Sequence, residues 1–157
     1  MTTVTIEIDI NASPQRTFET FTNLPRMGEV VTAINKMEIL TDGPVGIGTR
    51  FSETRTMMGK QATEEMEVTQ FEPPSRFVHE AKSHGCHYIS TYRFEPVGDG
   101  TKVTLDFEGR ALTFGAKLMT IALGWMMKGA IRKCVGADFN DLKAEAETEP
   151  AETAETP

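Results

Sequence analysis

Several polar side chains that could take part in chemistry recur at every second position between residues 49 and 110. Successive side chains of a β-strand point to opposite faces of the sheet, so this spacing places each set on one face. If hairpin turns lie at residues 58–60, 83–86 and 97–100, the predicted inward face carries these polar side chains: Glu53, Arg55, Glu64, His79, Tyr88, Ser90 and Tyr92. The same face carries three large apolar side chains: Met57, Met66 and Phe107. This is more polarity than a closed core tolerates, because a buried charge without a partner is very costly.

Arg55 is the strongest candidate for holding a polar ligand atom. Its planar guanidinium donates to two acceptors at once, which suits an anionic or carbonyl oxygen. A structural ion pair with Glu53 or Glu64 at the mouth of a cavity explains the same three residues equally simply. Both interpretations stay open.

His79 could act as a general acid or base, because imidazole titrates near neutral pH. Tyr88 and Tyr92 could donate to a ligand oxygen or polarise a carbonyl group. A hydrogen-bonded core histidine and ordinary sheet tyrosines are the alternative. We take His79, Arg55 and Tyr92 as candidate catalytic residues and the other inward residues as candidates for ligand binding.

The histidines and cysteines do not predict a metal site. His79, His84, Cys86 and His87 crowd one hairpin, but the alternation puts His79 and His87 on opposite faces. No glycine-rich phosphate loop opens a helix, and no base is placed to activate Cys86. We therefore expect neither a metal nor a cofactor.

Length and charge limit the remaining classes of function. The 157 residues suit one domain, and five of the 23 acidic residues lie in residues 144–157, so the rest carries little net charge. The absence of a basic patch argues against nucleic acid as a partner. The first ten residues lack the basic and apolar regions of a signal peptide, which predicts a cytoplasmic location with reduced thiols.

The elements that must position these side chains follow from periodicity. Alternating apolar residues predict a strand at residues 3–10, followed by two short helical segments that reach about residue 32. Six more strands are expected between residues 34 and 110, joined by short turns. One long helix is predicted at residues 114–143, and it must cover the apolar face of the sheet.

The two halves of the predicted helix differ in pattern. Apolar residues recur with helical spacing in its second half, at Ile131, Val135, Phe139 and Leu142. Residues 118–127 are apolar nearly all round and are too short to span a bilayer, although a peripheral membrane contact stays open. This run either lies in a core or lines a surface that receives something apolar, so three of its residues are added to the ligand-binding candidates: Ile121, Gly124 and Trp125. Four glycines, each costing roughly 1 kcal/mol in a helix interior, could break or kink the helix.

Several short motifs resemble those of a known superfamily. They are Asn11-Ala12-Ser13-Pro14 with Phe18, Gly46-Ile47-Gly48-Thr49-Arg50, Phe71-Glu72-Pro73-Pro74-Ser75-Arg76, Tyr92-Arg93-Phe94-Glu95-Pro96, Gly100-Thr101-Lys102-Val103-Thr104 and Leu142-Lys143. The chain is similar to the SRPBCC proteins, the START/Bet v 1-like superfamily, and within it to the polyketide cyclase/dehydrase-like branch. The resemblance implies an α+β helix-grip fold, in which a curved antiparallel sheet of about seven strands wraps around a long C-terminal helix. It implies one ligand-binding domain at residues 1–143, and the composition of residues 144–157 predicts a disordered acidic tail.

Three functions remain open. The first is binding of a hydrophobic small molecule, such as a lipid, a quinone or an aromatic polyketide, by a monomer or homodimer. The second is a polyketide cyclase/dehydrase-like enzyme that uses the inward-facing histidine, arginine and tyrosines. The third is a protein-interaction module that uses the apolar face at residues 118–127.

Overall fold

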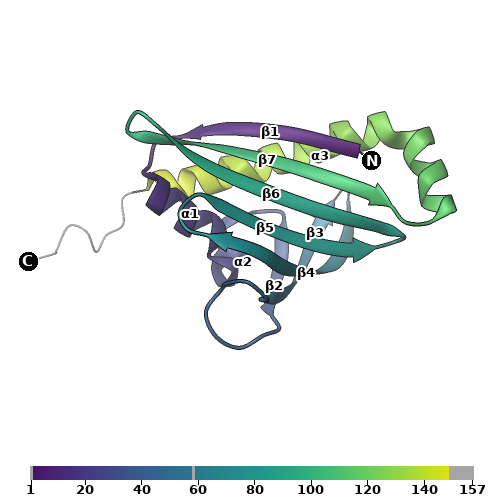
Figure 1. The fold of residues 1–157 in the computed structure, drawn as a ribbon, viewed down its shortest axis with the longest axis horizontal. Helices are drawn as coiled ribbons and strands as arrows, with labels where there is room; N and C mark the ends of the chain where they lie inside the picture. Colours follow the sequence, from purple (N-terminus) through teal and green to yellow (C-terminus); the bar gives the residue numbers. More distant parts are fainter. Residues whose placement is uncertain (1, 58, 149–157) are drawn as a thin grey trace, which may run out of the picture.

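The computed structural model describes residues 2–57 and 59–148. A seven-stranded antiparallel sheet curves around the second half of one long helix, and shorter helices follow the first strand (Figure 1). The elements, in chain order, are β1 (Thr2–Ile10), α1 (Pro14–Thr22), η1 (Leu24–Arg26), α2 (Met27–Val30), β2 (Ile34–Ile39), β3 (Arg50–Met57), β4 (Lys60–Glu72), β5 (Arg76–Ser83), β6 (Cys86–Val97), β7 (Gly100–Ala111) and α3 (Phe114–Glu147). The order of strands across the sheet is β1-β7-β6-β5-β4-β3-β2. The predicted helix-grip fold is confirmed.

The first helix begins where its capping residues predict. The side chain of Ser13 accepts a hydrogen bond from the backbone N–H of Arg16 at 3.1 Å, and a proline occupies the first helical turn. Phe18 and Phe21 point from α1 into the core, where both rings make edge contacts with Phe94. The short helices therefore close one end of the sheet.

Turn chemistry sets the register of the central strands. His84 and Gly85 form the two-residue turn between β5 and β6, both with positive φ (52° and 75°), the combination that matches the twist of a hairpin. His79 consequently pairs with Ser90, and Ser90 pairs with Phe107 on the next strand. The predicted faces of these three strands are those of the structure.

The long helix α3 is a single element through its four glycines, but it bends where its first half leaves the sheet (Figure 1). Its second half buries Phe139 and Leu142 against the sheet, as the spacing predicts. Its first half extends past the end of the sheet (Figure 1). Within the described residues, none of the helices combines the length and apolar character needed to cross a bilayer.

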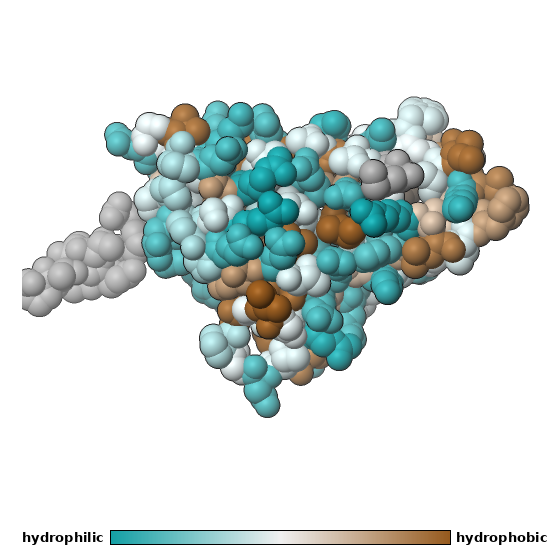
Figure 2. Space-filling view, in the orientation of Figure 1, coloured by the Kyte–Doolittle hydropathy of each residue, from teal (hydrophilic) through white to brown (hydrophobic). Residues whose placement is uncertain are grey.

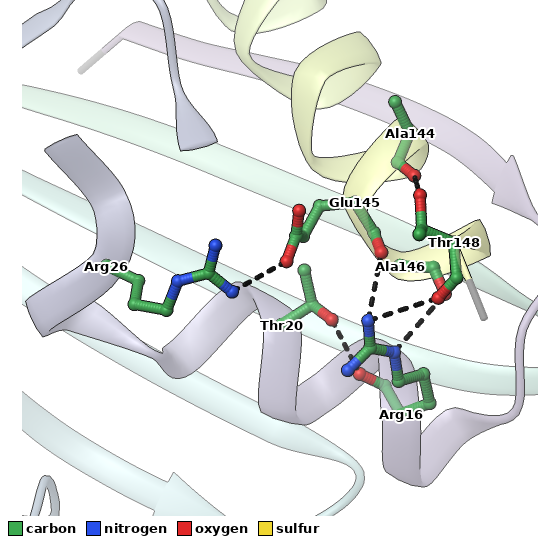
Figure 3. A network of polar contacts seen from close by, with 7 residues as sticks. All are labelled: Arg16, Thr20, Arg26, Ala144, Glu145, Ala146 and Thr148. Atoms are coloured by element: carbon green, nitrogen blue, oxygen red, sulfur yellow. Dashed lines mark hydrogen bonds and ion pairs between the residues drawn. The ribbon is translucent and has the colours of Figure 1, made fainter. Parts of the chain in front are cut away.

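The C-terminal end of α3 is held by two arginines (Figure 3). Arg16 donates to the backbone carbonyls of Glu145, Ala146 and Thr148 at 3.0, 3.4 and 3.3 Å, and these are among the carbonyls that a helix end leaves without partners. Arg26 pairs with the Glu145 carboxylate at 2.8 Å. The helix thus runs to Glu147, four residues beyond the predicted end of the domain, while residues 149–157 of the predicted tail lie outside the described part of the chain.

Candidate functional site

A cavity of about 500 Å³ lies between the first half of α3 and the adjoining ends of β6 and β7. Its lining is contributed by the β5–β6 turn, the two strands and the helix: His84, Cys86, Tyr88, Phe107, Gly109, Ala111, Gly115, Ala116, Met119, Thr120, Leu123, Gly124, Met127 and Ile131. The Tyr88 and Phe107 rings stack with centroids 5.7 Å apart and form its floor. Gly115 and Gly124 face open space, since a Cβ atom at either position would meet nothing within 4 Å.

The lining of this cavity is mainly apolar, with a few polar groups. Thr120 donates to the Ala116 carbonyl of its own helix at 2.9 Å, so that hydroxyl proton is already used. Burial raises the pKa of the Tyr88 hydroxyl to about 12, and a hydrogen bond with the Cys86 side chain and the charge of Glu64 contribute to this rise. Tyr88 therefore stays protonated at neutral pH and can donate a hydrogen bond to an oxygen of a bound molecule.

A second, smaller group of polar side chains lies under the second half of α3. Arg55 contacts the Glu53 carboxylate at 2.5 Å and the Asp138 carboxylate at 2.9 Å, and all three side chains are at most 17% exposed. Burial alone would lower the pKa of Arg55, but the two carboxylates raise it above its ordinary value. Burial raises the pKa of Asp138, and Arg55 opposes that rise. This cluster is a partly buried ion triad.

His79 and Tyr92 border the same triad. The His79 ring lies 5.5 to 5.7 Å from the rings of Phe51, Phe77 and Tyr92, and its remaining accessible surface faces a cavity of about 70 Å³. Burial, together with the charge of Arg55, lowers the pKa of His79 to about 4. Burial also raises the pKa of Tyr92. Both side chains are therefore uncharged at neutral pH.

The predicted site residues separate into two groups. Tyr88, Phe107 and Gly124 line the large cavity. Glu53, Arg55, His79 and Tyr92 line the small cavity, so the three candidate catalytic residues do meet, although their catalytic role stays a prediction.

Six further candidates lie elsewhere, and among the described residues they line neither cavity. Ser90 is buried within the sheet, and Met66 packs against the core. Met57 and Glu64 are half-buried on β3 and β4. The structure turns Ile121 and Trp125 away from the cavity, with 81% and 77% of each residue exposed, because the opposite side of the helix faces the cavity.

Asp138 is the member of the ion triad that sequence reasoning missed. It supplies the second carboxylate to Arg55, the role expected of Glu64. Its position carries a signal, because an acidic residue at 138 interrupts the apolar series that includes Val135, Phe139 and Leu142. A charge on the buried face of a helix requires a partner of opposite sign, and Arg55 is the inward-facing cation of the opposing sheet.

Solved structures of low sequence identity share this fold. The protein TTHA0849 from Thermus thermophilus is 19% identical, with a TM-score of 0.76, covering 92% of this chain and 96% of that one. The Zhui aromatase/cyclase from Streptomyces sp. R1128 is 17% identical, with a TM-score of 0.74 and coverage of 92% and 93%. A START superfamily protein from Mycobacterium smegmatis is 13% identical, with a TM-score of 0.73 and coverage of 92% and 97%.

Sequence comparison gives a family and no individual relative. No curated protein is significantly similar to this chain in sequence. The family model described as polyketide cyclase / dehydrase and lipid transport matches residues 1–147, which is nearly the whole described chain. The resemblance to the SRPBCC superfamily is thereby confirmed, and this chain belongs to the polyketide cyclase / dehydrase and lipid transport family.

Proposed function

We propose that this protein binds a hydrophobic small molecule in the cavity between α3 and the ends of β6 and β7. The observation that carries the proposal is the size and chemistry of that cavity. Its volume of about 500 Å³ falls in the range of small-molecule sites, and its lining is mainly apolar with few polar groups. Membership of a family described by both cyclase/dehydrase activity and lipid transport supports this choice.

The residues around the cavity indicate how such a ligand would be held. Met119, Met127 and Leu123 come from α3, and flexible thioethers adapt to apolar ligands of different shape. The stacked rings of Tyr88 and Phe107 offer a flat apolar floor. The protonated Tyr88 hydroxyl is a donor for one polar atom of the ligand. A mostly apolar molecule with a single oxygen near one end, such as a lipid, a quinone or an aromatic polyketide, matches this lining.

A cyclase- or dehydrase-like activity is the second candidate. It is favoured by the meeting of His79, Arg55 and Tyr92 around one cavity. That cavity holds only about 70 Å³, which is too small for a polycyclic substrate, and Arg55 is already engaged by two carboxylates. Binding in the large cavity needs no rearrangement and is therefore preferred.

A pair of glycine substitutions on α3 tests the binding proposal. In Gly124→Leu the new side chain enters the cavity, whereas in Gly129→Leu the same change lies at a position that does not line it. The affinity of each purified variant for the apolar dye 1-anilinonaphthalene-8-sulfonate is measured by fluorescence titration. Because overfilling a packed site costs about 1–3 kcal/mol, we expect Gly124→Leu to weaken binding by at least about fivefold. Gly129→Leu should stay within about twofold of the wild type.

The identity of the ligand requires a separate measurement. Native mass spectrometry of protein purified from its source cells, followed by denaturing extraction, should release an apolar molecule in stoichiometric amount. Equal dye affinities for wild type and Gly124→Leu, with both proteins folded, would place the binding site elsewhere and refute the proposal.

A further inference from the structure

The outward face of the first half of α3 is apolar, although it does not line the cavity. Phe114, Leu118, Ile121 and Trp125 follow one another at spacings of four, three and four residues, which aligns them on one side of a helix. They are 77%, 53%, 81% and 77% exposed. Figure 2 shows apolar residues gathered at the end of the molecule where the first half of α3 projects. We call these four residues the outer stripe.

An amphipathic helix in a water-soluble protein normally turns its polar face to solvent. Here the side that meets the sheet already carries the apolar lining of the cavity, including Met119, Leu123 and Met127, yet the opposite side, which faces solvent, is also apolar. The core does not use the outer stripe, and a contiguous exposed apolar surface of this kind marks an interaction site.

The charges around the outer stripe indicate the chemistry of its partner. Residues 114–137 contain four basic residues and no acidic residue, in a chain whose net charge is −7. Lys117 lies three residues after Phe114, and Lys128 lies three residues after Trp125, so both side chains border the stripe and both are exposed. Among residues 2–57 and 59–148, no carboxylate lies within ion-pair distance of either lysine.

We infer that the outer stripe docks this protein onto the surface of an anionic lipid bilayer. The four apolar side chains enter the boundary between head groups and acyl chains, and Lys117 and Lys128 lie at the level of the lipid phosphates. Trp125 is suited to this depth, because its ring is apolar and its N–H finds acceptors among the head groups. A second copy of this chain is a poorer partner, since its matching stripe would bring the same lysines into like-charge contact.

Docking of this kind would place the cavity beside the membrane. The cavity lies on the opposite side of the same helix, so a lipid-derived ligand would have only α3 to pass. This last step rests on the proposed function, whereas the docking itself rests on the stripe and its charges alone.

Trp125 is the only tryptophan of the chain, so it reports directly on docking. The full-length protein is mixed with vesicles of phosphatidylcholine, with or without phosphatidylglycerol. We expect a blue shift of tryptophan emission, quenching by brominated acyl chains and co-sedimentation with the anionic vesicles. Binding should weaken as salt is added, because salt screens the attraction of lysines to phosphates.

Two pairs of variants separate the apolar and the charged contributions. Ile121→Asp should abolish co-sedimentation, whereas Ile47→Asp, a similarly exposed isoleucine (73%) in the loop between β2 and β3, should leave it unchanged. Lys117→Ala/Lys128→Ala should weaken binding about 30-fold, on the basis of roughly fivefold for each basic residue near an anionic surface. Lys36→Ala/Lys102→Ala removes two lysines from the sheet and should change the affinity by less than about twofold.

Three results would overturn the inference. In the first, the wild-type protein stays in the supernatant when anionic vesicles are sedimented. In the second, the control variants lose binding as strongly as the stripe variants. In the third, the tryptophan emission shifts to the blue with rising protein concentration in the absence of vesicles. The last result would assign the stripe to a second copy of the chain. Gly124→Leu should retain vesicle binding while losing dye binding, so failure of docking and failure of the cavity proposal give different results.

Discussion

Replacing Arg55 with methionine should destabilise the protein far more than a comparable change on the surface of the same strand. Arg55 neutralises the Glu53 and Asp138 carboxylates at 2.5 and 2.9 Å, and both acidic side chains are 15% exposed. Methionine keeps much of the length of the side chain and removes the charge, which leaves two carboxylates close together and mostly out of water. Breaking a buried ion pair by removing one partner costs about 3–5 kcal/mol.

Urea unfolding at neutral pH measures this loss. With a slope of about 1–3 kcal/mol per molar urea, the midpoint should fall by roughly 2 M. Arg50→Met is the matched control, because Arg50 pairs with Glu65 on the outer face of β3, and those side chains are 53% and 51% exposed. An exposed pair contributes about 1 kcal/mol or less, so the midpoint of this variant should hardly move.

The pH dependence provides a second check. Without Arg55, the influence that lowers the pKa of Asp138 is gone, so that pKa rises further above its ordinary value. The folded variant then binds more protons than its unfolded chain in the mildly acidic range, and its stability falls as the pH rises through that range. The difference from wild type should therefore shrink between pH 7 and pH 5. Equal losses for Arg55→Met and Arg50→Met, or a loss that does not change with pH, would refute the account of the triad.

Two further predictions concern His79 and the end of α3. Because the pKa of His79 is lowered to about 4, its ring signals in NMR spectra should not titrate between pH 8 and 5. In the unfolded chain the histidine binds a proton near pH 6.5, so up to about 3 kcal/mol of stability should be lost as the pH falls from 6.5 toward 4. The variant His79→Phe should lack this loss. A His79 ring that titrates near pH 6.5 would contradict the prediction. Arg16→Met should cost about 1.5–3 kcal/mol, because three carbonyls at the end of α3 lose a charged donor, and hydrogen exchange should quicken in residues 140–148. Unchanged exchange there would show that Arg16 does not hold the helix.

The faces of the sheet could be predicted because short turns leave little freedom. Once His84 and Gly85 occupy the turn, every pair from Ser83–Cys86 to Arg76–Arg93 is determined, and a shift of one residue would turn the apolar side chains to solvent. The inward positions of His79, Tyr88 and Tyr92 follow from that register. Local pattern thus determined which side chains point inward, but not which of them meet.

The set of side chains that lines each cavity depends on where α3 lies along the sheet and on how the helix is rotated about its axis. Residues 118–127 are apolar nearly all round, so periodicity gives no preferred face, and only the structure shows Gly124 inward with Ile121 and Trp125 outward. The sequence also did not show whether α3 continues as one helix through its glycines. A break would require a costly second nucleation and would leave backbone groups without partners, which outweighs roughly 1 kcal/mol for each glycine.

Arg16 fixes the C-terminal end of α3, because its guanidinium donates hydrogen bonds to the last carbonyls of that helix. Its second half is packed on the sheet, whereas its first half bends away past the end of the sheet (Figure 1). At 1.5 Å per residue, residues 114–127 span about 20 Å, so a tilt of about 10° at the bend displaces the free end by about 4 Å. A displacement of that size at the free end would widen the gap between Met119 and the Phe107 ring without breaking any backbone hydrogen bond of the helix. Access to the cavity would then depend on the bend of α3, while Arg16 and Arg26 keep the far end of the same helix in place.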